Sequence, residues 1–110
     1  MHDELENQTG IAVAQILIDR EKLAAFCRKH HIRKLAFFGS VLRDDFGPDS
    51  DVDVLVEFEP GYVPGLAFFS MQDELSELIA REVDLNTPQF LSHYFRNEVL
   101  AEAEVQYEQA

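Results

Sequence analysis

The stretch GSVLRDDFGPDSDVDVLVEFEPG, residues 39–61, decides the fold expected for this chain. Residues 35–38, just before it, are a short apolar run, which is typical of a buried strand. Residues 51–59 within it alternate almost strictly between polar and apolar, and such alternation is typical of a second strand. One face of that strand carries Val52, Val54, Val56 and Phe58, and the other carries Asp51, Asp53, Leu55 and Glu57. We therefore predict two strands joined by a polar connection over residues 40–50.

The flanking segments predict helices around these strands. Asp19 has the character of an N-cap, and the apolar residues Leu23, Phe26 and Cys27 follow at helical spacing. A second helix is predicted from the spacing of Phe68, Met71, Leu75, Leu78 and Ile79. Residues 82–86 read as a strand and residues 92–104 as a last helix, whereas residues 11–18 fit a helix or a strand equally well. The order predicts an α/β fold in which helices are layered on a sheet.

Length and composition bound the function. The 110 residues suit one domain, expected over residues 19–110 after a partly flexible leader at 1–18. A net charge of −12 repels a nucleic-acid backbone, so we expect neither DNA nor RNA as a partner. No apolar run is long enough to cross a membrane, and the start does not resemble a signal peptide. With a single cysteine, Cys27, the simplest expectation is a cytoplasmic protein.

Gly39 and Ser40 stand where the first strand gives way to a loop or a short helix. Glycine lets the backbone approach a phosphate closely, and N–H groups at a helix start favour an anion. The Ser40 hydroxyl adds a donor, although Gly-Ser alone is a common turn dipeptide.

Asp51 and Asp53 strengthen this interpretation. Two carboxylates two residues apart on a strand lie on the same face, where they repel one another unless a divalent cation lies between them. The alternative is that both face solvent on an edge strand.

Three further residues are weaker candidates. Asp84 lies on the polar face of the strand at 82–86 and joins the site if that strand lies beside Asp51 and Asp53. It would then be a metal ligand or a base, although an isolated aspartate is more often exposed or capping. Ser50 supports the loop or contacts a phosphate. Arg43 reaches a triphosphate or pairs with Asp44 or Asp45.

Together these residues resemble the DNA-polymerase-β-like nucleotidyltransferase superfamily, and most closely its minimal nucleotidyltransferase (MNT) domains. The resemblance rests on Gly-Ser, ten residues, Asp-x-Asp and a later acid, and extends over residues 19–107. It implies a small mixed sheet with helices packed mainly on one face. It also implies phosphate binding by Gly39 and Ser40, and Mg²⁺ binding by Asp51 and Asp53, with Asp84 completing the triad.

The resemblance further implies a setting. MNT domains of this size are usually antitoxins of HEPN ribonuclease toxins, and they transfer AMP from ATP to a toxin tyrosine. The pair Asp44–Asp45 departs from the family by placing acids where many members have glycine or a base. Two rivals remain: an antitoxin that neutralises its toxin by masking it, and a small-molecule nucleotidyltransferase of the aminoglycoside type. Larger relatives carry an extra domain that holds the acceptor, and 110 residues leave no room for one, which counts against the small-molecule alternative.

Overall fold

The structure, a computed structural model, describes residues 11–13, 16–43, 47 and 49–109. The predicted flexible leader at 1–10 and the acids Asp44 and Asp45 lie outside these residues. The elements in chain order are β1 (Ile11–Val13), β2 (Ile16–Ile18), α2 (Arg20–Lys29), β3 (Ile32–Phe38), the 3-10 helix η1 (Gly39–Leu42), β4 (Val52–Phe58), α3 (Ala67–Ile79), β5 (Val83–Asn86), the 3-10 helix η2 (Pro88–Phe90), α4 (Arg96–Glu102) and β6 (Glu104–Glu108).

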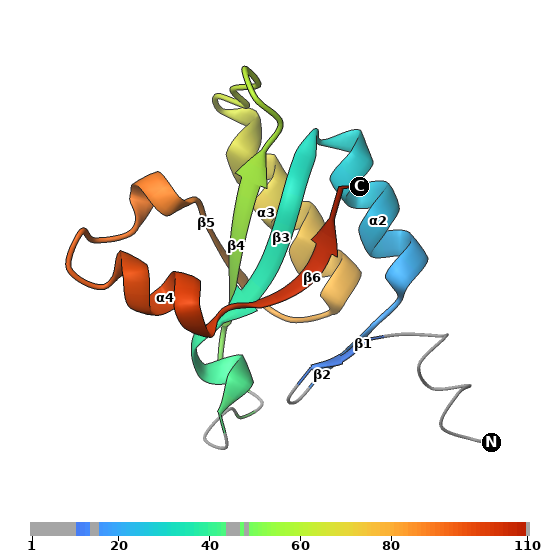
Figure 1. Ribbon diagram of the computed structural model, residues 1–110. Coiled ribbons are helices and arrows are strands. Elements are labelled where there is room, and N and C mark those ends of the chain that lie inside the picture. The colour runs from blue at the N-terminus through green and yellow to red at the C-terminus, as the bar shows by residue number, and fades with distance from the viewer. Residues whose placement is uncertain (1–10, 14–15, 44–46, 48, 110) are drawn as a thin grey trace.

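A four-stranded mixed sheet in the order β5-β4-β3-β6 forms the centre of the molecule (Figure 1). Strand β3 pairs antiparallel with both β4 and β6, whereas β4 pairs parallel with β5. The parallel pair is connected by α3, as a crossover between parallel strands requires. The first residues of β4 and β5 therefore lie at the same end of the sheet, together with the last residues of β3.

Alternation along β4 divides the core between two faces. Val52, Val54 and Val56 are completely buried in the larger cluster, beside residues of α2 and α3. Leu55 points to the opposite face and packs with Phe38, Leu91 and Val99 in a smaller cluster under α4. The predicted arrangement is confirmed: the two longer helices cover one face, and the short α4 lies on the other (Figure 1).

Helix α2 begins as predicted. The Asp19 side chain accepts hydrogen bonds from the backbone N–H groups of Glu21 and Lys22, which are among the donors that a helix start leaves unpaired. Leu23, Phe26 and Cys27 form its buried face. Burial raises the pKa of the Cys27 thiol to about 12, so this cysteine is a small core residue and not a reactive thiol.

Strand β5 lies at the sheet edge, and α3 satisfies its outward-facing backbone donors. The N–H of Val83 donates to Ser76 Oγ at 3.0 Å, and that of Leu85 donates to Gln72 Oε1 at 2.9 Å. These bonds cover an edge that would otherwise be open to pairing with another chain. They also hold β5 in register beside β4.

The chain after residue 91 differs from the prediction. The last helix is shorter, Arg96–Glu102, and it is followed by the strand β6, which the sequence analysis missed. Val105 is about half exposed and Gln106 is buried, so β6 lacks the apolar alternation that marks a strand. Its pairing with β3 places it in the sheet, and a bulge opposite Leu35 and Ala36 accommodates Gln106.

The undecided segment at 11–18 contains two short strands, β1 and β2, which pair antiparallel. Ile18, at the end of β2, is buried in the main core. The division at residues 18 and 19 stays a prediction. Among the residues that the structure describes, no helix is long and apolar enough to cross a membrane.

Candidate active site

The start of β4 and the start of β5 bring two aspartates together. In the parallel register Asp53 pairs with Asp84, and strands so paired lie about 4.8 Å apart. Each neighbours buried residues of the main core, Val52 and Val54 or Val83 and Leu85, so both carboxylates point away from that core. Asp51, exposed, comes immediately before β4. Asp84 is expected from the sequence to join the site if its strand lies beside the strand of Asp51 and Asp53, and β5 does lie beside β4.

Asp53 is held in an unfavourable environment for an anion. Partial burial, with the neighbouring charges of Asp84 and then Asp51, raises the pKa of its carboxyl from 3.8 to about 6, and Arg43 opposes this only in part. A carboxyl whose pKa is raised by burial and by like charges is a marker of a functional site. A cation bound between these carboxylates would remove the repulsion.

Gly39 is required by its geometry. It has a φ of +79°, in the left-handed region that residues with a Cβ rarely adopt. In addition, a Cβ built on Gly39 would overlap Asp53 Oδ2. Strand β3 ends opposite Asp53, which pairs with Phe38, so the chain must turn directly beneath that carboxylate. Only glycine permits the turn without displacing Asp53.

Ser40 and Arg43 follow in and after the short helix η1. Ser40 is partly exposed, and its carbonyl accepts the N–H of Arg43 at 2.9 Å. The Arg43 guanidinium donates from Nη2 to Glu102 Oε1 at 3.3 Å and to Oε2 at 3.4 Å, at the end of α4. An exposed pair of this kind contributes little to stability. Arg43 is thus close enough to act on Asp53, and its ion-pair partner within the described residues is the exposed Glu102.

Ser50 supports the loop before β4. Its Oγ accepts the N–H of Gly47 at 3.0 Å, and its own N–H donates to the Gly47 carbonyl at 3.1 Å. Arg81 donates to the carbonyls of Gly47 at 2.6 Å and Ser50 at 3.0 Å. Of the two roles that the sequence left open for Ser50, the structure displays loop support. Neither Arg81 nor Glu102 was predicted, because contacts between distant segments leave no local pattern.

The acids suit a hard cation, although they do not enclose one. Asp51, Asp53 and Asp84 offer only carboxylate oxygens, the ligands that Mg²⁺ prefers. Over the described part of the chain, no group of three or more His, Cys, Asp or Glu side chains is arranged to hold a metal ion. One or two carboxylates combined with substrate phosphates are the usual Mg²⁺ site, so the residues present fit an ion that arrives with a nucleotide.

Comparison with known proteins agrees with this geometry. The model of the nucleotidyltransferase domain family matches residues 20–105, which include every element from α2 to the start of β6. The chain belongs to this family. A solved structure of a provisionally assigned minimal nucleotidyltransferase is 34% identical, with a TM-score of 0.64, over 76% of this chain and 85% of that one. The resemblance to MNT domains is therefore confirmed.

Two further comparisons concern a curated relative and a solved structure. A provisionally named protein adenylyltransferase of Methanocaldococcus jannaschii is 42% identical over 59 residues, which is 52% of this chain and 57% of the relative. A toxin–antitoxin structure with AMP-PNP has the same fold, with a TM-score of 0.67 and 17% identity over 84% of this chain and 75% of that one. The domain thus spans little more than half the length of the first relative.

Proposed function

We propose that this nucleotidyltransferase domain is a Mg²⁺-dependent protein adenylyltransferase, an antitoxin that transfers AMP from ATP to a tyrosine of a partner HEPN ribonuclease toxin. The observation that carries the proposal is the pairing of Asp53 with Asp84 directly above Gly39. The names of the adenylyltransferase relative and of the toxin–antitoxin structure support the nucleotide and the partner.

The residues have separate tasks in the proposed reaction. Asp51 and Asp53 would hold Mg²⁺, which supplies charge neutralisation on the nucleotide phosphates. Gly39 and Ser40 would position those phosphates, because the turn at Gly39 brings the backbone close to the acids. Arg43 would exchange Glu102 for a phosphate oxygen, gaining a charge-assisted hydrogen bond. Ser50 would keep the loop in place, as its bonds to Gly47 indicate.

The acceptor hydroxyl would attack the α-phosphorus of ATP. A new P–O bond forms to the tyrosine oxygen, the bond to the β-phosphate oxygen breaks, and pyrophosphate leaves. Asp84 would accept the hydroxyl proton, a role that its exposed position on the rim of the site allows. Most of the acceleration would come from positioning and electrostatics.

The test is transfer of label from ATP labelled at the α-phosphate. The acceptor to be tested is a candidate toxin, which would be a small helical protein with an Arg–x4–His motif, to be sought in the reading frames next to that of this chain. We expect label on the toxin with the wild type and Mg²⁺, and none with the double variant Asp51→Asn and Asp53→Asn. Undiminished labelling by that variant would remove the acids from the mechanism.

A second candidate is neutralisation by masking, without chemistry. It is favoured by the large apolar side chains that the domain leaves exposed, because exposed apolar patches are typical of binding surfaces. The two candidates separate in cells that carry the toxin. If the double variant still rescues growth at the wild-type level, masking suffices; if rescue is lost while binding persists, the chemistry neutralises.

A further inference from the structure

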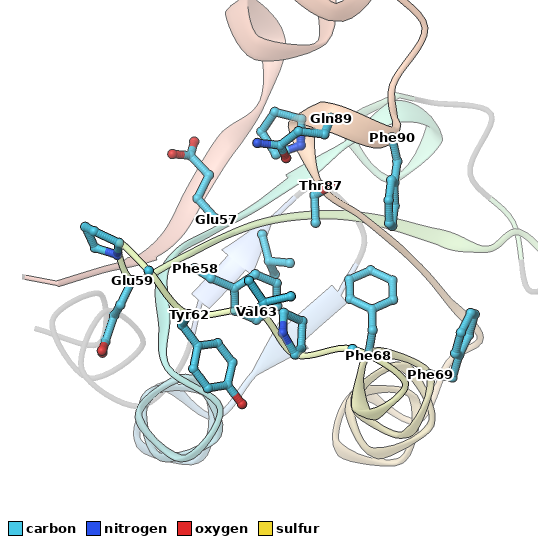
Figure 2. A pocket seen from close by; sticks show the side chains of 16 residues that line it. Glu57, Phe58, Glu59, Tyr62, Val63, Phe68, Phe69, Thr87, Gln89 and Phe90 are labelled. Atoms are coloured by element: carbon cyan, nitrogen blue, oxygen red, sulfur yellow. The ribbon is translucent and has the colours of Figure 1, made fainter.

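A pocket opens at the other end of β4, away from the aspartates. Its volume is about 610 Å³, and it lies between the end of β4, the loop to α3 and η2 (Figure 2). The lining includes the aromatic residues Phe58, Tyr62, Phe68, Phe69 and Phe90. Phe58 lies five positions after Asp53 along β4, which is about 16 Å at the rise of a strand. No residue of the proposed active site lines this pocket.

Large apolar side chains are exposed at the pocket, where Val63, Phe69 and Phe90 line it, and at Leu66 in the adjoining loop. Val63 is 83% exposed, Leu66 85%, Phe69 63% and Phe90 66%. All four come from the loop after β4, from the start of α3 and from η2, so they surround one opening. An apolar patch on this scale marks a binding site more often than a feature of the fold.

Contacts among its own residues hold the walls of the pocket in place. The Tyr62 ring stacks on the His31 ring with centroids 4.4 Å apart. The backbone N–H of Tyr62 donates to the Glu59 carbonyl at 3.0 Å. Phe68 meets Phe90 edge to face at 5.4 Å, so α3 and η2 are in contact across the pocket floor. A preformed site avoids the entropic cost of ordering its walls when a partner binds.

The charge at the pocket rim has one sign. Among the described residues that line the pocket, the only Asp, Glu, Lys, Arg or His side chains are Glu57 and Glu59. Glu57 pairs with Arg33, whereas Glu59 is bonded to His31 and Gln109 and pairs with no Lys or Arg in the described part of the chain. Figure 2 shows both acids on one side of the pocket and Phe69 and Phe90 on the other.

We propose that this pocket is the docking site for the acceptor protein, which inserts one large apolar side chain flanked by Lys or Arg. The apolar side chain would enter between Phe69 and Phe90, and the base would pair with Glu59. This inference rests on the proposed function for the existence of an acceptor protein. Docking and AMP transfer would then use opposite ends of the same strand.

Other occupants suit the surface less well. A small molecule filling the pocket would leave Leu66, which does not line it, exposed. A second copy of this chain would bring its own net charge of −12 to an acidic rim, and like charges facing one another oppose association. A basic protein segment satisfies both the apolar walls and the acids.

The experiment measures the affinity of the candidate toxin for variants of the full chain. Phe69→Ser and Phe90→Ser should each weaken binding by at least about tenfold, because aromatic residues dominate interface energies. The matched control is Tyr94→Ser, which removes an aromatic side chain that is 93% exposed and lies outside the pocket. It should bind like the wild type. Circular dichroism melts verify that each variant is folded.

Charge is tested separately at Glu59. Glu59→Lys should slow association and reduce the dependence of the association rate on salt, because it reverses the charge that would attract the partner. Phe69→Ser should instead act mainly on dissociation. Wild-type association rates in the Glu59→Lys variant would remove the basic flank from the proposal.

The outcomes distinguish this inference from the proposed function. In the transfer assay the loss in Phe69→Ser should lie in KM, whereas the loss in Asp53→Asn should lie in kcat. Wild-type affinity in both Phe variants overturns the docking site and leaves the transferase standing. If the Phe variants lose affinity for the toxin and the wild type transfers no AMP, the docking site stands and neutralisation by masking is favoured. Self-association of the chain that depends on Phe69, or no binding of the toxin by the wild type, overturns the proposal.

Discussion

The two ends of β4 are both energetically unfavourable, and for opposite reasons. At its start, Asp51, Asp53 and Asp84 gather negative charge, so that ionising Asp53 works against two neighbours and partial burial. Beyond its end, Phe69, Phe90 and their neighbours leave apolar surface in water. The start is polar and suited to a cation and phosphates, whereas the end is apolar and suited to a protein. A fold alone requires neither, so each end indicates a separate function.

The largest expected effect is on catalysis at the start of the strand. Asp53→Asn keeps the shape of the side chain and removes the charge that would hold Mg²⁺. We expect kcat for AMP transfer to fall by about 10²–10³-fold, which is the usual cost of removing one electrostatic contact to a transition state. Steady-state transfer to the toxin measures this. Toxin affinity, governed by the other end of β4, should change by less than about twofold.

The second effect contrasts two glycines with similar backbone angles at the two ends. Gly39 has a φ of +79° and Gly61 of +85°, but only Gly39 has an atom within 4 Å of the position of an added Cβ. Gly61→Ala should cost about 1 kcal/mol from the backbone angle. Gly39→Ala adds an overlap with Asp53 and should cost about 3 kcal/mol in total. Denaturant unfolding of both variants gives the difference; equal costs would mean that Asp53 moves aside freely.

The third effect is a gain in stability, whereas most substitutions destabilise a protein; the substitution is Asp53→Asn. The pKa of Asp53 is raised from 3.8 to about 6 in the folded chain, so the folded state binds more protons between these values. Stability without metal should therefore fall as the pH rises from about 4 to 6. At pH 7 Asp53→Asn should be more stable than the wild type by about 1 kcal/mol, after allowing for solvent screening of a partly exposed group.

Thermal melts in EDTA at pH 4 and pH 7 measure this effect. The advantage of Asp53→Asn should be present at pH 7 and nearly absent at pH 4, where Asp53 is protonated in the wild type. Addition of Mg²⁺ with a non-hydrolysable ATP analogue should stabilise the wild type more than the variant. A variant that is less stable at pH 7 would contradict the electrostatic account.

The smallest effect concerns the pocket. Tyr62→Leu keeps an apolar side chain but removes the stack on His31, which should cost about 0.5 kcal/mol of stability. Toxin affinity should fall slightly because the pocket loop is less ordered, and kcat should not change. A heteronuclear NMR titration of the loop residues reports loop order and toxin affinity, and steady-state transfer measures kcat. A change in kcat would show that the two ends of β4 are coupled.

The sequence predicted the acidic end better than the aromatic one, for a physical reason. Asp51 and Asp53 lie within one strand, so alternation alone places them on one face. Asp84 needed the neighbouring strand, and the sequence left open whether that strand lies beside Asp51 and Asp53; the parallel pairing of β4 with β5 supplies this. The pocket is assembled from the end of β4, a loop and η2, and no periodic pattern spans such segments. Phe68 was predicted correctly as core, but the exposure of Phe69 and Phe90 was not foreseen.

Strand β6 was missed for a related reason. Its residues Glu104, Val105 and Gln106 neither alternate nor cluster, and its place in the sheet depends on hydrogen bonds to β3. Local pattern predicts elements that bury their own apolar side chains. An edge strand that depends on its partner has no such signal.

The contact between Gly39 and Asp53 has a consequence for interpreting relatives. A glycine beside a phosphate site is usually taken as a mark of nucleotide binding, but here a carboxylate next to it already excludes any other residue. A descendant that stopped using ATP and kept Asp53 would still have to keep the glycine. Conversely, once Asp53 became a smaller residue, only the backbone angle would resist replacement of Gly39. Loss of the glycine should therefore follow loss of the aspartate in such lineages, and the aspartate is the residue that reports on the chemistry.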